Sequence, residues 1–239
     1  MNARSGRFRA PRGLIGPRHG GHTVTAEELG ALSLAVGGDG VMIGDDVEGQ
    51  PHLLGLHRST PYDVLLIGGL WTAQVLALRA AGTGARVAVE TGRPQEWTRL
   101  AHAAGAGLEC ITLHEVGRVP PMGATVGSPV VVVRDCGMRP PRGRVVSSAW
   151  QSVVTLLPYL SPVGPRLLRD ATLVGVQRVS PEEARQIGRI LGLEPPEMEA
   201  LPTLADGVTL WCSGRERTWV LTSGTDAELG LLGVARRME

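Results

Sequence analysis

The sequence predicts an α/β protein of three layers, with helices on both faces of a mainly parallel sheet of about five strands and a β-hairpin near each end of the chain. Two observations support this prediction. Short aliphatic runs alternate with segments of helical length between residues 63 and 113, and the most apolar run, Val130 to Val133, follows that alternation. Apolar strands that alternate with helices are typical of parallel sheets buried on both faces.

The runs place five core strands and the helices between them. We expect strands at 63–67, 86–90, 109–113, 129–134 and 171–176. We expect helices at 70–81, 95–104, 149–160 and 180–191, and a short helical turn at 197–201. The helix from residue 180 has the clearest start, because Ser180-Pro181-Glu182-Glu183 forms a capping box with proline in the first turn.

The two hairpins lie outside this alternation. In the first, runs 40–44 and 52–57 flank a turn-rich segment, and in the second, runs 208–212 and 218–222 flank residues 213–216. We interpret residues 23–239 as a single α/β domain, because a chain of this length can bury one large core.

Residues 1–22 differ from the rest in composition. They hold five arginines and several glycines but no acidic residue. Such a segment buries too little apolar surface to fold, so we expect a disordered basic tail. This tail either makes weak contact with an anionic surface, such as nucleic acid, lipid or an acidic partner, or only aids solubility.

The composition excludes several classes of protein. Cys110, Cys136 and Cys212 are far apart and the six histidines lack metal-type spacing, so we expect neither a disulfide framework nor a metal site. No apolar run approaches the ~20 residues of a transmembrane helix, and no signal peptide is recognisable, which indicates a cytoplasmic protein. The chain has no lysine, which excludes any mechanism that needs one. Its abundant Ala, Gly, Val and Arg are associated with GC-rich bacterial genomes.

The turn from Gly68 to Thr72 lies where α/β proteins bind nucleotides, at the carboxyl end of a strand and the start of a helix. A phosphate-binding loop needs G-x-x-x-x-G-K-[ST], since the lysine contacts the phosphates and the hydroxyl binds magnesium. Leu70 and Trp71 stand at the two positions after Gly69 where the lysine and the hydroxyl would be, and we expect Trp71 to stand in the space of a phosphate. The turn therefore predicts no hydrolysis and no cofactor, and it either binds phosphate weakly or serves only the fold.

A rival interpretation uses the same turn for a dinucleotide. Glu90 ends the second core strand about twenty residues after Gly68, where a ribose-binding acid lies in dinucleotide-binding folds. The glycine pattern is incomplete, since Leu70 and Ala73 replace its second and third glycines. Glu90 is otherwise a solvated acid at the end of a strand.

Two further candidates also lie at strand ends. Asp135 follows the valine strand, where P-loop enzymes carry a magnesium-binding acid. It otherwise pairs with a nearby arginine, for which the candidates are Arg134, Arg139, Arg142 and Arg144. Gln177 ends the fifth strand, from which a side chain could sense a γ-phosphate. No catalytic triad is indicated by any flanking motif.

The order of these features resembles the motor ATPases of the FtsK, HerA and conjugation families, a group that includes the secretion ATPases of type VII systems. The hairpin from Gly40, the strand Val130 to Asp135, the segment 172–178 and the closing region 191–208 carry the resemblance. It implies a RecA-like P-loop topology, with the turn after residue 67 in place of the P-loop. The departure at residues 70–73 implies a relative that does not hydrolyse nucleotides.

The resemblance thus implies a catalytically inactive, ATPase-like component of a bacterial secretion or DNA-translocation assembly, which acts by binding protein. The expected partner is a protein such as an active motor ATPase, and self-association is a second expectation. The chain would be cytoplasmic and would reach a membrane only through its partner. The alternative is an NAD- or FAD-binding oxidoreductase that uses Gly68, Gly69 and Glu90.

Overall fold

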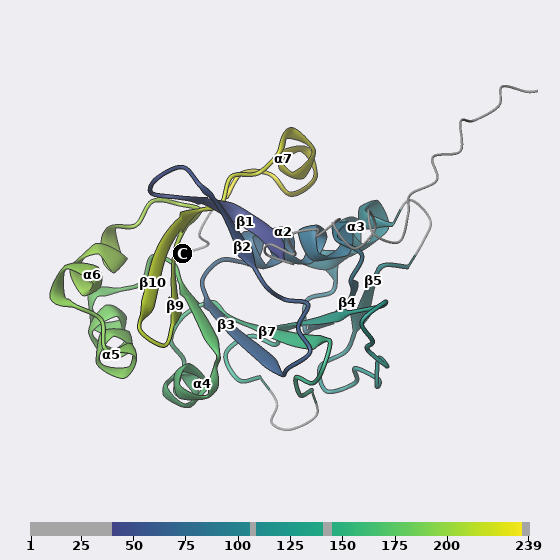
Figure 1. Cartoon of the computed structure of the whole chain (residues 1–239), viewed down its shortest axis with the longest axis horizontal. Coiled ribbons are helices and arrows are strands. Elements are labelled where there is room, and N and C mark those ends of the chain that lie inside the picture. The colour runs from purple at the N-terminus through teal and green to yellow at the C-terminus, as the bar shows by residue number, and fades with distance from the viewer. Residues whose placement is uncertain (1–39, 106–108, 141–144, 236–239) are drawn as a thin grey trace, which may run out of the picture. The chain divides into compact units, whose positions relative to one another are not determined.

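A ten-stranded sheet with helices on both faces is formed by the residues that this computed structural model describes, 40–105, 109–140 and 145–235 (Figure 1). The strands follow the order β2-β1-β10-β9-β8-β3-β7-β6-β4-β5 across the sheet. In chain order the strands are β1 (Val41–Asp46), β2 (Pro51–Leu54), β3 (Tyr62–Ile67), β4 (Arg86–Thr91), β5 (Ile111–His114), β6 (Val130–Asp135), β7 (Gln151–Leu157), β8 (Leu173–Val176), β9 (Val208–Ser213) and β10 (Glu216–Leu221). The helices are α2 (Leu70–Gly82), α3 (Gln95–Ala104), α4 (Gly164–Asp170), α5 (Pro181–Leu191), α6 (Pro195–Ala200), the 3-10 helix η1 (Leu201–Thr203) and α7 (Asp226–Leu232).

The six strands β8-β3-β7-β6-β4-β5 are parallel throughout. The prediction of about five strands was too low, because the sheet has ten and is partly antiparallel. Both predicted hairpins are present, as β1–β2 and β9–β10. They extend the same sheet, since β9 pairs with β8 and β10 pairs with β1. The hairpins thereby cover the edge of β8, which would otherwise expose unpaired backbone groups.

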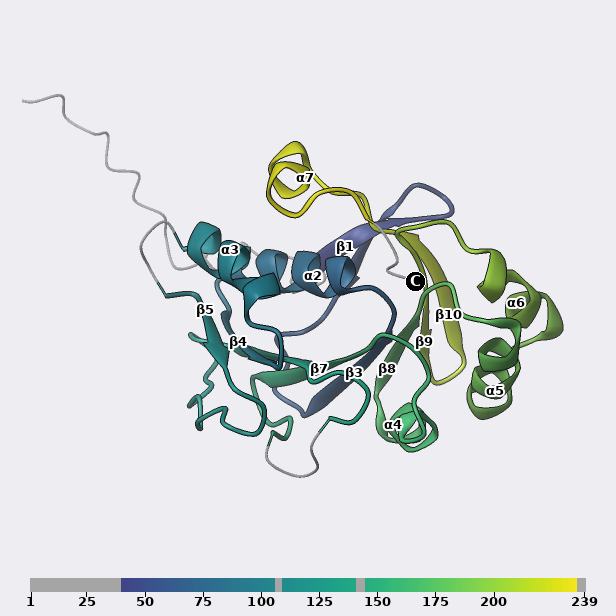
Figure 2. The ribbon, with the colours of Figure 1, turned by 180° about the vertical axis from the view of Figure 1, so that it is seen from behind.

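The predicted three layers are confirmed for the parallel core (Figures 1 and 2). Alternate side chains of β3 point to opposite faces of the sheet, as expected for a strand. Leu66 packs in the core formed with α2 and α3, whereas Leu65 and Ile67 pack in the core formed with α4 and α5. The strand is therefore buried on both sides, which explains its uninterrupted apolar sequence.

The segment 149–160, predicted as a helix, contains the strand β7. This strand lies between β3 and β6, in the middle of the sheet. A short apolar run that is buried on both sides has no periodicity to distinguish strand from helix. The strand is favoured by the β-branched residues Val153, Val154 and Thr155 and by Pro158 directly after the strand, since β-branched residues prefer strands and proline cannot continue a helix.

The predicted start of α5 is confirmed in detail. Ser180 Oγ accepts the N–H of Glu183, the Glu183 carboxylate accepts the N–H of Ser180, and Pro181 occupies the first turn. The helix ends at Leu191 and is followed by Gly192, whose φ of 66° is the left-handed conformation that glycine adopts most readily. The helices α4 and α7 were not predicted.

The predicted basic tail, residues 1–22, lies outside the described residues, as do Arg142 and Arg144. The described residues belong to one compact unit, Gly38–Glu239. Among them, the helices are all too short or too polar to cross a membrane.

Candidate functional site

The turn between β3 and α2 contains only Gly68 and Gly69. A phosphate-binding loop has four residues between its two glycines, and their N–H groups surround the phosphate. Here the strand leads almost directly into the helix, so no such loop exists. The first N–H groups of α2 still lack intrahelical partners, as at any helix N-terminus.

Gln177 bonds through its side chain to this turn and to the first turn of α2. It follows β8, next to β3, where its backbone N–H donates to Ile67 O at 2.9 Å. Its side-chain Oε1 accepts the N–H of Gly69 at 2.7 Å. Its Nε2 donates to Thr72 Oγ1 at 2.7 Å and to Thr209 Oγ1 at 3.1 Å. The carboxamide thus occupies the position that an anion takes at a helix N-terminus.

The fit between Gln177 and the turn depends on a glycine. A Cβ at Gly68 would overlap the carboxamide of Gln177, so no larger residue fits there without displacing it. The cavity that remains over the turn has a volume of about 20 Å³. That is room for roughly one water molecule. A phosphate therefore cannot reach the turn while Gln177 holds its position.

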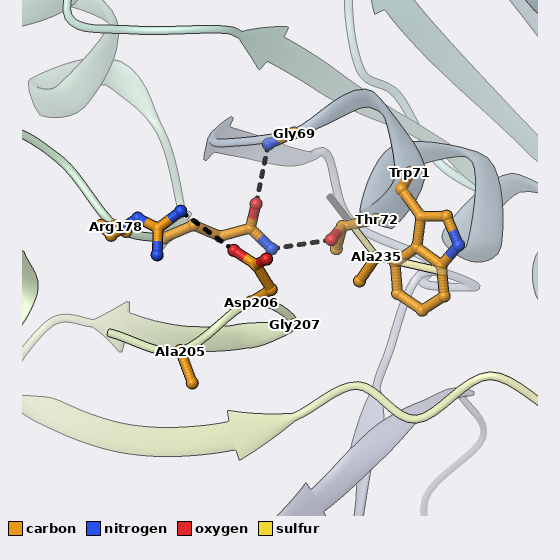
Figure 3. A pocket seen from close by; sticks show the side chains of 9 residues that line it. Gly69, Trp71, Thr72, Arg178, Ala205, Asp206, Gly207 and Ala235 are labelled. Atoms are coloured by element: carbon orange, nitrogen blue, oxygen red, sulfur yellow. Dashed lines mark hydrogen bonds and ion pairs between the residues drawn. The ribbon is translucent and has the colours of Figure 1, made fainter. Parts of the chain in front are cut away.

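Trp71 lines this cavity but does not close the turn. Its indole points away from Gly69 (Figure 3), and its Nε1 donates to Gly233 O at 2.8 Å. The obstruction that we expected from Trp71 comes from Gln177 instead. Gln177 is correspondingly not placed as a phosphate sensor, because its amide is already bonded to the turn.

Asp135 ends β6 and is 1% exposed. Arg93 donates to both of its oxygens, from Nε to Oδ2 and from Nη2 to Oδ1, each at 2.8 Å. Trp97 Nε1 and Thr91 Oγ1 donate to Oδ2 at 2.8 and 3.2 Å. The hydrogen bonds to Asp135 raise the pKa of Arg93 above its usual value. An ion pair was predicted here, but the partner is Arg93, which lies between β4 and α3, whereas the predicted candidate Arg134 bonds to Glu90.

Glu90 is buried at the end of β4, where its Oε2 accepts Arg134 Nε at 2.5 Å and its Oε1 accepts the N–H of Gly117 at 2.7 Å. In dinucleotide-binding folds, the strand that carries the ribose-binding acid is adjacent to the strand before the glycine turn. Here β7 and β6 lie between β3 and β4, which places Glu90 three strand spacings, about 14 Å, from the turn. The dinucleotide alternative is therefore wrong, and Glu90 is not a solvated acid.

The residues present fit neither a nucleotide with magnesium nor a dinucleotide. The turn lacks both the loop and the lysine that hold a phosphate, and the acids at the ends of β4 and β6 are bound by arginines. The thiol of Cys136, the residue after Asp135, stays protonated at neutral pH and is therefore a poor nucleophile. Burial, and then the charge of Glu90, raises its pKa to about 12. Among the described residues, no group of three or more His, Cys, Asp or Glu side chains is placed to hold a metal ion.

Sequence reasoning missed the partners that complete these sites. Arg93 lies 42 residues before Asp135, and Thr209 lies 32 residues after Gln177. No local motif marks either residue, because the strand order brings them to their partners. The strand-end positions of Asp135 and Gln177 were the only signal that the sequence offered.

Comparisons with solved structures place this arrangement among known folds. VirB4 of Thermoanaerobacter pseudethanolicus matches 81% of this chain and 98% of its own, with a TM-score of 0.58 and 11% identity. The genome packaging NTPase B204 of Sulfolobus turreted icosahedral virus 2 matches 70% of this chain and 98% of its own, with a TM-score of 0.46 and 10% identity. EccC (ATPases 2 and 3) of Thermomonospora curvata matches 81% of this chain and 42% of its own, with a TM-score of 0.45 and 14% identity. No protein-family model matches the sequence, and no curated protein matches it.

At 11% identity, the likeness to VirB4 shows the fold alone. The chain has a P-loop ATPase-like fold. More narrowly, its fold is similar to that of VirB4, which agrees with the resemblance that the order of its sequence features indicated. Within that fold, its own side chains fill the place where P-loop proteins bind phosphate.

Proposed function

We propose that this protein is a catalytically inactive, ATPase-like component of a bacterial secretion or DNA-translocation assembly, and that it acts by binding another protein. The closed turn carries the proposal. Gln177 accepts the N–H of Gly69 in the turn and leaves a cavity of about 20 Å³, and the chain contains no lysine to contact a phosphate.

The retained fold supports a binding role. A chain that keeps the motor fold without its chemistry still presents the surfaces of that fold. We therefore propose an active motor ATPase as the partner, and self-association as the second arrangement to test. Because the sequence resembles a group that includes the type VII secretion ATPases, a type VII system is the first assembly in which to look. Motor or secretion genes beside the gene for this chain would support this choice.

Turnover of ATP and GTP by the purified protein tests catalytic inactivity. We expect none above background, and we expect Asp135→Asn and Thr72→Val to leave that background unchanged. Thr72→Val is included because it removes a hydroxyl at the turn without breaking an ion pair. Turnover that either substitution abolished would contradict the proposal.

Cross-linking in the native host tests the binding role. The full chain would carry an affinity tag and a photo-reactive residue at an exposed position, and the cross-linked proteins would be identified by mass spectrometry. We expect a motor ATPase or another secretion component, with sedimentation of the purified chain reporting self-association separately. Recovery of the chain without any cross-linked protein, as a monomer, would contradict a binding role.

A further inference from the structure

The helix α7 is attached to the rest of the molecule through residues 222–225, which belong to no strand. We call residues 225–235 the strap. The strap lies against α2 and α3 and pairs with no strand of the sheet, so it can leave without breaking the sheet (Figures 1 and 2). Elements attached in this way open at a lower free energy than the core.

Three side chains of α2 and α3 hold the strap by hydrogen bonds. Arg79 donates to both carboxylate oxygens of Glu228, at 2.7 and 2.8 Å. Arg99 Nη2 donates to Gly230 O at 3.1 Å, and Trp71 Nε1 donates to Gly233 O at 2.8 Å. All of these donors belong to the helices of the core and all of the acceptors belong to the strap.

Apolar burial contributes less to this contact. Leu232 packs beside the core cluster of α2 and α3, but Glu228, at 6% exposed, is the only strap residue that is buried. A helix whose most buried side chain is a carboxylate depends on the partner of that carboxylate. Without Arg79, the strap would bury an unpaired charge.

Arg79 is positioned by the core as well as by the strap. Its Nη1 donates to Met42 O of β1 at 3.0 Å, and its Nη2 donates to Ser223 O at 2.6 Å. The bond to β1 does not involve the strap, so it holds the guanidinium near the same place when the strap leaves. The face then presents a fixed cation, the indole N–H of Trp71 and the donors of Arg99 beside apolar surface.

We propose that the strap is a displaceable occupant of a docking face formed by Trp71, Arg79 and Arg99, and that a partner protein binds this face with a short amphipathic helix. The chemistry of the strap defines the chemistry of that helix. It carries a carboxylate for Arg79 and, four residues later on the same side, an apolar residue in place of Leu232. This proposal rests on the proposed function, in which the chain acts by binding protein.

Competition between strap and partner gives the proposal its test. The apparent dissociation constant of an added helix equals the intrinsic constant divided by the fraction of molecules with an open strap. A substitution that weakens the strap without altering the face must therefore strengthen binding of the added helix. Glu228→Gln is such a substitution, whereas Arg79→Gln alters the face itself.

The probe is a fluorescein-labelled peptide of residues 225–235, titrated into the full chain and followed by anisotropy. We expect Glu228→Gln to bind the peptide about tenfold more tightly than wild type, because a hydrogen-bonded charge pair has been lost from the competing strap. The double variant Glu228→Gln, Arg79→Gln should not bind it. Asp226→Asn, which removes an exposed charge from the same helix, serves as the matched control and should bind as wild type does.

Amide exchange of the strap in Glu228→Gln is measured alongside. Faster exchange with tighter peptide binding supports the docking face. Faster exchange without peptide binding overturns it, as does equal binding by wild type, Glu228→Gln and the double variant. Absence of exchange differences also overturns it, because the ion pair would then not hold the strap. These failures would leave the absence of turnover and the cross-linking result untouched, so the proposed function is tested separately.

Discussion

The carboxyl ends of β3 and β6 are the places where a P-loop enzyme holds phosphate and magnesium, and this chain fills them differently. At β3 an uncharged carboxamide, that of Gln177, bonds to a backbone N–H and two hydroxyls. At β6 a carboxylate, that of Asp135, is bound by an arginine and an indole. A buried charge is tolerated only while its partner is present, whereas a neutral amide can leave at lower cost. We conclude that the end of β6 is fixed structure and that the end of β3 is the more readily reopened of the two.

The largest effect is expected from Asp135→Asn. The substitution removes the charge that compensates Arg93, whose side chain is 29% exposed, and should lower the free energy of unfolding by about 3 kcal/mol. Urea denaturation measures this loss. The matched control is Glu115→Gln, which breaks the exposed pair with Arg118 and should change stability by less than about 0.5 kcal/mol. Equal effects of the two substitutions would contradict the conclusion that the buried ion pair at the end of β6 is fixed structure.

A smaller loss is expected from Gln177→Ala. It leaves the Gly69 N–H and the hydroxyls of Thr72 and Thr209 without the carboxamide, which should cost about 2 kcal/mol of unfolding free energy. Gln95→Ala, at an exposed glutamine, is the control and should be nearly neutral. A loss below about 0.5 kcal/mol for Gln177→Ala would show that the carboxamide does not hold the turn closed.

The smallest effect concerns the carboxylate of Glu228, in the strap. Burial alone would raise its pKa, but hydrogen bonds from Arg79 and from the N–H of Thr225 lower the pKa below its usual value. The ionised form therefore favours the docked strap. The ionised carboxylate stabilises the docked strap fully above about pH 4.3, the usual glutamate pKa. This stabilisation is lost as the pH falls through the lowered pKa of Glu228.

Nuclear magnetic resonance of the strap glycines, Gly230 and Gly233, measures this dependence. We expect no change between pH 7 and 5, loosening of the strap below about pH 4, and no such step in Glu228→Gln. Loosening between pH 7 and 6 would mean that another group holds the strap.

Much of the fold followed from the sequence. The alternation of apolar runs and helices predicted every parallel strand except β7, and the turn residues predicted both hairpins. The strand β7 was missed because a run buried on both faces has no period. The start of α7 was missed although Thr225 and Glu228 form a capping box, a pattern that is readable from sequence.

Less of the site could be predicted. The absent lysine and the incomplete glycine pattern indicated that the turn does not bind phosphate as a P-loop does. Which side chain closes the turn depends on β8 lying beside β3, and the partner of Asp135 depends on β4 lying beside β6, because Arg93 follows β4. Both depend on contacts between distant segments, which no local motif encodes.

Calorimetric titration of ATP with magnesium into wild type and Gln177→Ala tests whether Gln177 closes the turn to phosphate. We expect no binding to wild type tighter than about 1 mM, which corresponds to only ~4 kcal/mol. Any binding gained should appear in Gln177→Ala, where the N–H of Gly69 is released. Micromolar binding of ATP to wild type, unchanged by Gln177→Ala, would contradict the account.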